Sequence, residues 1–207
     1  MTLDAGGAAL WPKPKERESK RALKREAVLR TSVRLFNEKG FHATSLDEVA
    51  AVLQVTKPTL YHYFPSKDDI LFECVRLGYE EIRQAAADAE AKARSGIDRL
   101  RLLMEDYAVL MTKDFGRCAA RTTDVELSEQ SRQRFRGLKR EIEMIVRAAV
   151  QAGMDDGTIR RGNVVLMTFT LIGALNWIAY WHDPKGRLTP EEIAEGAVET
   201  LLRGVAA

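Results

Sequence analysis

The segment 44–71 gathers hydroxyl, imidazole and ammonium side chains that can donate hydrogen bonds to nucleic acid. Residues 56–67 contain no Asp or Glu, so no carboxylate there repels a phosphate backbone. We therefore predict a DNA-reading surface of the kind that a helix presents to the major groove. The residues assigned to phosphates are Thr44, Ser45, Thr56, Tyr61 and Lys67, and those assigned to base edges are Lys57, Thr59 and His62, with Tyr63 assigned to either.

Two short helices joined by a tight turn must position these groups. The apolar residues of the first recur at i, i+3, i+4 and i+7 on one helical face, at Leu46, Val49, Ala50 and Leu53. Thr44 or Ser45 can cap this helix, and Thr56 can cap the second. Pro58 falls in the first turn of the second helix, where its missing N–H costs little. The pattern predicts a helix-turn-helix whose turn is made by residues 54–55.

This segment resembles the helix-turn-helix of the TetR family of bacterial transcription regulators. The resemblance rests on Ala50, Leu53, Val55 and Thr56, on the run Leu60-Tyr61-His62-Tyr63-Phe64, on Ser66-Lys67-Asp68, and on the upstream stretch 35–41. Gln54 stands where members usually place glycine, and a left-handed backbone there costs Gln about 1 kcal/mol. The alternative for Tyr61 and Phe64 is an ordinary place in a core, which we expect for Phe64.

The resemblance implies an all-helical fold of about nine helices in two domains. We expect a disordered tail over residues 1–16, a helix-turn-helix domain over 17–67, and a ligand-binding and dimerisation domain over 68–207. The first 67 residues carry 12 Lys/Arg against 7 Asp/Glu. The basic residues 17–25 are predicted to lie near phosphate, and the alternative for such an arm is a solvated, disordered segment.

Helical periodicity and break residues divide the chain further. Long helices are predicted over 18–39, 66–93, 97–113, 128–152, 163–181 and 190–204, with a shorter segment over 118–126 and an interruption at Gly116. No stretch of about 18 apolar residues and no signal peptide are recognised, so we expect a cytoplasmic protein without a membrane span.

Enzyme and metal chemistry find little support in the residue pattern. The three histidines are far apart with no Glu-x-x-His, and the two cysteines, Cys74 and Cys118, match no metal spacing. We expect no catalytic residue, metal or cofactor. Cys74 lies in an apolar helical stretch and is expected to be a buried, small hydrophobic residue.

A ligand pocket is predicted between helices of the C-terminal domain, where such sites are mostly apolar. Its candidate polar groups are Arg117, Arg121 and Asn176, and either arginine could hold a phosphate or pair with a surface carboxylate. The alternative for the apolar candidates is the plain core. Those candidates are Met104, Tyr107, Met111, Phe115, Phe135, Ile142, Met144, Met167 and Leu171.

A second surplus of apolar residues predicts a helical interface with a second copy of the chain. The candidates are Phe169, Trp177, Trp181, Ile193, Val198 and Leu201, with the monomer core as the alternative for each. A two-fold dimer also suits a palindromic operator, because paired reading helices match two half-sites.

The stretches 174–181, 184–186 and 188–192 resemble a subgroup of TetR regulators of fatty-acid and steroid catabolism, which respond to acyl-CoA thioesters. The resemblance implies a dimeric repressor that binds double-stranded DNA. A small hydrophobic effector, an acyl-CoA or an aromatic molecule, would release it from the DNA. For a CoA thioester, Arg117 and Arg121 would hold the phosphates. The alternatives are a ligand-independent or architectural DNA-binding protein and a transcriptional activator.

Overall fold

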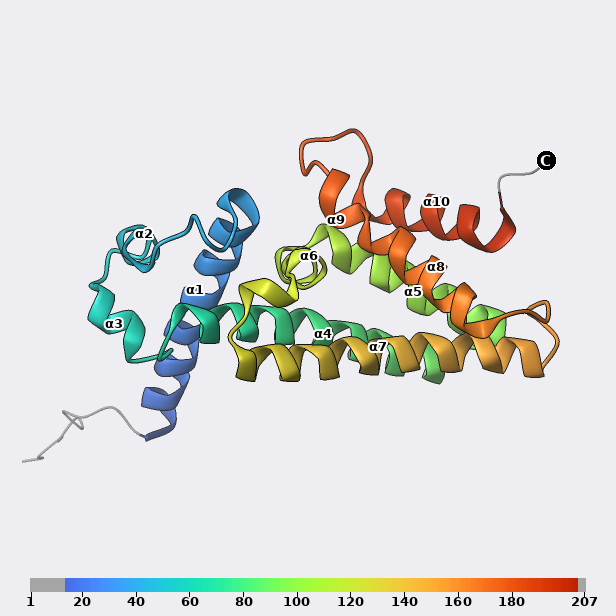
Figure 1. Ribbon diagram of the computed structural model, residues 1–207, viewed down its shortest axis with the longest axis horizontal. Coiled ribbons are helices and arrows are strands. Elements are labelled where there is room, and N and C mark those ends of the chain that lie inside the picture. The colour runs from blue at the N-terminus through green and yellow to red at the C-terminus, as the bar shows by residue number, and fades with distance from the viewer. Residues whose placement is uncertain (1–13, 205–207) are drawn as a thin grey trace, which may run out of the picture.

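The computed structural model describes residues 14–204, and within this range every regular element is helical (Figure 1). The helices are α1 (Pro14–Lys39), α2 (Leu46–Val52), α3 (Lys57–Tyr61), α4 (Lys67–Lys92), α5 (Gly96–Thr112), α6 (Asp114–Arg121), the 3₁₀ turn η1 (Asp124–Glu126), α7 (Glu129–Asp155), α8 (Val164–Asn176), α9 (Ile178–Trp181) and α10 (Pro190–Arg203). The expected all-helical fold is confirmed, and the expected number of helices holds when the short α9 is counted with α8.

The N-terminal unit is formed by α1, α2 and α3, and the start of α4 closes it (Figure 1). The inner face of α1 is buried at Val28, Leu29, Ser32, Leu35 and Phe36. This helix begins at Pro14, four residues before the predicted start, so residues 14–16 are helical rather than part of a tail. The rest of the predicted tail, residues 1–13, lies outside the described residues.

The turn between α2 and α3 contains a residue in the left-handed backbone conformation. This agrees with the glycine that members of the TetR family usually have at this position. Gln54 has a φ of 56°. The N–H of Gln54 donates to the carbonyl of Ala51 (3.1 Å), and the N–H of Val55 donates to the carbonyl of Ala50 (3.0 Å). This pair of bonds is the Schellman arrangement that ends a helix, and its left-handed position favours glycine.

Gln54→Gly is therefore expected to stabilise the protein by about 0.5–1 kcal/mol. The substitution relieves a left-handed cost of about 1–2 kcal/mol, and the greater freedom of glycine in the unfolded chain offsets part of that gain. Urea denaturation of both proteins at equal concentration measures the difference. Gln54→Ala retains the Cβ and serves as the control; a gain as large in that variant would contradict the left-handed explanation.

Long helices of the C-terminal domain pack around a core shared by α4, α5 and α7. Figure 1 shows α4 leaving the N-terminal unit and running beside α7 along the length of the molecule. The start of α5 meets the end of α7 backbone to backbone: a Cβ at Gly96 would lie 2.2 Å from the Cα of Gly153. Only glycine permits that approach, and it lets Asp156 and Thr158 accept the first N–H groups of α5 at 2.6 and 3.0 Å.

Three predicted boundaries differ from the structure. Gly116 does not interrupt a helix but lies within α6, because the break falls at Lys113, whose backbone is extended. The segment after α6 is a separate 3₁₀ turn rather than part of one helix. The apolar helix expected over 163–181 is broken at Trp177 into α8 and α9.

The segment Val164–Trp181 is long and apolar enough to cross a membrane, with a mean hydropathy of 1.6. The prediction that no such stretch exists is therefore wrong. The inner side chains of this segment, Leu171, Leu175 and Ile178, are buried within the bundle. A helix that completes a protein core passes the same length and composition test, so this test alone does not make the segment a membrane span.

Candidate DNA interface and effector pocket

The outer face of α2 and α3 carries a hollow bordered by groups that suit a phosphate backbone. It has a volume of about 410 Å³, and Ser45, Lys57 and Tyr61 are among its lining residues. Ser45 caps α2: its hydroxyl accepts from the N–H of Glu48 (3.1 Å), while the Glu48 carboxylate accepts from the N–H of Ser45 (2.8 Å). The positive end of the α2 dipole thus borders the hollow, where an anion is stabilised.

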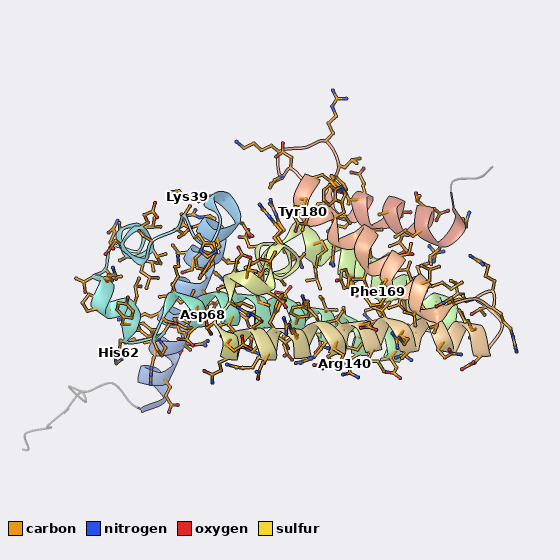
Figure 2. All side chains as sticks on the ribbon, in the orientation of Figure 1. Lys39, His62, Asp68, Arg140, Phe169 and Tyr180 are labelled. Atoms are coloured by element: carbon orange, nitrogen blue, oxygen red, sulfur yellow. The ribbon has the colours of Figure 1, made fainter. Side chains whose placement is uncertain are left out.

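The predicted base-reading residues lie on the exposed side of α3. Lys57 donates to Asp47 at 2.9 Å, and that carboxylate raises the pKa of the lysine. The hydroxyls of Thr56 and Thr59 share a hydrogen bond of 3.0 Å. His62 caps the C-terminal end of α3, and Figure 2 shows it at the outer edge of the N-terminal unit. Pro58 stands in the first turn, and Leu60 is the buried residue that anchors this short helix.

Two residues predicted to contact phosphate border the same hollow but form hydrogen bonds within the protein. The Thr44 side chain is 1 % exposed, and its hydroxyl donates to the carbonyls of Gly40 (2.9 Å) and Leu35 (3.2 Å). The Lys67 ammonium donates to the carbonyls of Phe41 (2.8 Å) and Thr44 (3.0 Å) and lies over the Phe41 ring. Both residues therefore hold the α1–α2 loop in place, and sequence spacing alone could not separate this role from DNA contact.

Tyr63 and the basic end of α1 are also tied to the protein. Tyr63 is half-buried against the core, and Phe64 is buried, as expected. Arg25, placed near phosphate by the sequence, instead pairs with Glu73 of α4 at 2.8 Å and lies over the Phe64 ring. The first helix is thereby tied to α4, the helix that continues into the C-terminal domain.

Glu73 is expected to make stability depend on pH. Hydrogen bonds from Arg76 first, and then from Arg25, lower its pKa to about 2 from an ordinary value of 4.5. Because the folded pKa lies below the unfolded one, the stabilisation is complete above pH 4.5 and is lost as the pH falls toward 2. Glu73→Gln should cost about 1–2 kcal/mol at pH 7.

Chemical denaturation at pH 7 and pH 3 measures this effect. The difference between the wild type and Glu73→Gln should shrink at the lower pH. Glu90→Gln is the matched control, because Glu90 is an exposed residue on the same helix with a single, longer ion pair to Arg99. A difference that stays constant with pH would show that Glu73 acts through packing rather than charge.

A larger hollow lies between α7 and α8, and we call it the α7–α8 pocket. Its volume is about 740 Å³. Tyr79 of α4 and Tyr107 of α5 border it, and α8 contributes Phe169, Ile172, Gly173 and Asn176. Figure 1 shows α8 diverging from α7 along its length. Such a volume suits a small-molecule ligand.

Four cations of α7 border this pocket, and we call them the basic rim: Arg136, Lys139, Arg140 and Arg147. Asp124 pairs with Arg136 (2.6 Å) and with Lys139 (3.1 Å), and Glu143 pairs with Arg147. Arg140 is exposed and has no ion pair within residues 14–204. The rim therefore has more positive than negative charge, which favours an anionic group on a ligand.

Some residues that the sequence predicts for a ligand pocket border this hollow, and others do not. Tyr107, Ile142, Met144 and Asn176 line the pocket. Met104, Met111, Phe135 and Leu171 are core residues, each at most 7 % exposed. Met167 and Phe115 lie outside the lining and pack against the core. Helical spacing identifies the inward face of a helix but not which inward residues border a void.

Arg117 and Arg121 are likewise outside this pocket. Arg121 donates to the carbonyl of Asn37 in α1 at 3.1 Å and lies over the Tyr180 ring. Arg117 is half-buried on α6 and does not border the pocket. The basic rim, which sequence reasoning missed, supplies the cations instead. The spacing of these cations from residue 136, at i, i+3 and i+4, was the sequence pattern that could have indicated them. A solvated helix face has the same pattern.

The helices α8 and α9 together present an exposed apolar face. Phe169 is 54 % exposed and Trp177 is 62 % exposed, and Trp177 stacks on Tyr180 with ring centres 5.1 Å apart. Trp181 and Leu201 border a groove of about 420 Å³ between this face and α10. Ile193 and Val198, which were also assigned to a dimer seam, are core residues of the monomer, at 5 % and 0 % exposed.

Comparison with known proteins agrees with this architecture. A family model described as tetracyclin repressor-like, C-terminal domain, matches residues 93–205, and one described as bacterial regulatory proteins, tetR family, matches residues 28–74. The HTH-type transcriptional repressor KstR2 of Rhodococcus jostii (strain RHA1) is 25 % identical over 209 residues, covering 95 % of this chain and 98 % of that protein.

Two solved structures are similar over most of the chain. PfmR from Thermus thermophilus, a TetR family transcriptional regulator, has a TM-score of 0.79 and 29 % identity, covering 87 % of this chain and 99 % of its own. AibR in complex with isovaleryl coenzyme A and operator DNA has a TM-score of 0.77 and 27 % identity, covering 86 % and 98 %. The chain belongs to the tetR family of bacterial regulatory proteins, and α2 and α3 form its DNA-binding helix-turn-helix.

Proposed function

We propose that this protein is a dimeric, cytoplasmic repressor that binds a palindromic operator and is released from it by an acyl-CoA thioester. The observation that carries the effector assignment is the α7–α8 pocket, which joins a basic rim to an apolar interior. A CoA thioester has the same two parts, phosphates at one end and an acyl group at the other. The similarity to KstR2 supports the repressor assignment, and the similarity to AibR in complex with isovaleryl coenzyme A supports this class of ligand.

The proposed DNA contacts follow from exposure. Ser45 and Tyr61 border the hollow on the reading face and are assigned to phosphates, together with Thr56. Lys57, Thr59 and His62 are assigned to base edges in the major groove, and Tyr63 is retained for either role through its exposed part. Thr44 and Lys67 are left out, because their side chains are bonded within the protein.

The proposed dimer covers the apolar face of α8 and α9. Phe169, Trp177, Trp181 and Leu201 are its candidate contacts. Large exposed aromatic side chains that adjoin an apolar groove are typical of subunit interfaces. A two-fold dimer would also pair two reading heads, as the two half-sites of a palindromic operator require.

Hydrogen bonds join the start of α7, the helix that borders the pocket further along, to the reading head. At the start of α7, the N–H and hydroxyl of Ser128 donate to Asp68 at 2.7 and 2.9 Å, and the Ser131 hydroxyl donates to it at 2.6 Å. The adjacent Lys67 holds the loop that precedes α2. Figure 2 shows Asp68 where α4 enters the N-terminal unit. A ligand that shifts α7 would thus move the reading head.

Asp68→Ala is expected to weaken this coupling. Operator and ligand should each still bind. In coupled sites a ligand usually changes the second affinity by a factor of about 5–150, and we take about 10 for the wild type. In Asp68→Ala, the factor by which the ligand lowers operator affinity should be several-fold smaller. Anisotropy titrations with and without ligand measure the factor. Asp88→Ala on the same helix, where Asp88 pairs with Gln84, is the control. An unchanged factor in Asp68→Ala would contradict this route.

The proposal is tested by titrating the protein onto a labelled fragment of its own promoter and then adding acyl-CoA thioesters of increasing chain length. Release by a thioester, with free CoA and free fatty acid much weaker, is the expected result. Arg140→Gln should weaken the thioester effect, whereas Arg161→Gln, an exposed residue outside the pocket, should not. Tight operator binding that no thioester disturbs would favour a ligand-independent regulator, and stimulation of transcription would favour an activator.

A further inference from the structure

One polar pair interrupts the apolar wall of the α7–α8 pocket. The hydroxyl of Tyr107 donates to the Oδ1 of Asn176 at 2.7 Å, and both residues border the cavity. Tyr107 is 3 % exposed, so its ring is held in the core and its hydroxyl is fixed. The bond therefore orients the Asn176 amide, because an amide whose oxygen faces Tyr107 must direct its NH₂ group elsewhere.

The Asn176 NH₂ group has no acceptor within residues 14–204. It lies on α8, across the pocket from the basic rim on α7. The Tyr79 hydroxyl is a second donor at this wall, since Tyr79 also borders the cavity and forms no hydrogen bond with the described part of the chain. The neighbouring side chains Ile142, Ile172 and Phe169 are apolar. A ligand here meets two donors beside apolar side chains.

An oriented donor in an apolar pocket selects for an acceptor. A ligand that covers such a donor without accepting from it pays the desolvation cost of the unpaired group, so the site favours ligands that carry an acceptor at this position. The phosphates of a CoA ester would lie at the basic rim, and the pantetheine arm joins them to the thioester and its acyl group, which we place against α8. The acceptor that every such ligand carries is a carbonyl oxygen.

We propose that Asn176, positioned by Tyr107, donates a hydrogen bond to a carbonyl oxygen of the bound thioester and thereby distinguishes effectors from molecules of the same shape without that carbonyl. This inference rests on the proposed acyl-CoA function and names the residue that reads the ligand. Tyr107 is a positioning residue, and the Tyr79 hydroxyl is the second donor. The oxygen belongs either to the thioester or to a further carbonyl on the acyl group.

Three probes separate these sources: hexanoyl-CoA, its thioether analogue S-hexyl-CoA without the carbonyl, and hexanoyl-CoA with a keto group near the chain end. Binding to the full-length protein is measured by calorimetry and by release of the promoter fragment. The wild type should bind hexanoyl-CoA about tenfold or more tightly than the thioether. If the outer carbonyl is the acceptor instead, the keto probe should gain that factor and the thioether should match hexanoyl-CoA.

The variants assign the effect to Asn176. Asn176→Leu keeps the volume without donors and should abolish the preference for the carbonyl, while Tyr107→Phe should reduce it. Asn176→Asp keeps the oxygen that accepts from Tyr107 but lacks the NH₂ group. This variant replaces Asn176→Leu in the test if the leucine variant folds poorly. Met144→Ala, at the same pocket, should weaken thioester and thioether alike and leave the preference unchanged.

The outcomes distinguish this inference from the function on which it rests. A carbonyl preference that persists in Asn176→Leu, or its absence for all probes in the wild type, overturns the assignment of Asn176 while the thioester function stands. Operator binding without binding of any CoA probe overturns the proposed effector and this inference together.

Discussion

Lys57→Gln is expected to lower operator affinity by about 100-fold. A contact to a base edge is worth about 1–3 kcal/mol, and about 1.4 kcal/mol corresponds to a tenfold change in affinity. Because a dimer loses the contact at both half-sites, a loss of about tenfold at each gives about 100-fold in total. Lys57 stands at the start of α3, and its present partner Asp47 is an exposed carboxylate. Breaking that ion pair on binding costs at most about 1 kcal/mol.

Titrations on the operator and on mutated operators measure the loss and its kind. For a base contact, the variant should lose discrimination at one position of each half-site. For a phosphate contact, all sequences should weaken alike and the salt dependence should become shallower. Lys92→Gln, an exposed lysine at the far end of α4, is the control. Equal affinities for Lys57→Gln, Lys92→Gln and the wild type would remove Lys57 from the interface.

Phe135→Ala is expected to destabilise the protein by about 3–5 kcal/mol, the usual cost of removing a buried phenyl ring. The Phe135 side chain is 0 % exposed, and its ring meets Tyr79 edge to face with centres 6.2 Å apart. The substitution leaves a cavity where α4 and α7 pack together. Thermal and urea denaturation measure the loss, and ligand binding should fail only as the folded population falls.

Met144→Ala is the matched comparison, because Met144 borders the pocket and is 50 % exposed. That variant should keep its stability to within about 1 kcal/mol and should change the affinity for the acyl group. A stable Phe135→Ala protein with altered ligand affinity would contradict the core assignment and restore Phe135 to the pocket, where the sequence pattern had placed it.

The sequence by itself determined the elements whose causes are local. Caps and breaks bound the helices: Ser66 caps α4 and Ser95 caps α5, as the positions of these residues before apolar runs indicate. The left-handed turn at Gln54 follows from its place after α2 and before a proline-bearing helix. The family and its helix-turn-helix also follow from sequence, because turn residues, caps and aromatic spacing all lie within one short segment.

Only the tertiary structure decided the roles of residues that depend on distant neighbours. Thr44 and Lys67 resemble DNA-binding residues until their bonds to the α1–α2 loop are seen. The helical repeat places Phe135 and Tyr107 alike on inward faces, yet only Tyr107 borders a void, since a void depends on how α7 and α8 diverge. The basic rim looks like a solvated face for the same reason. Side-chain chemistry is a local property, whereas exposure and partners are set by packing between helices far apart in the chain.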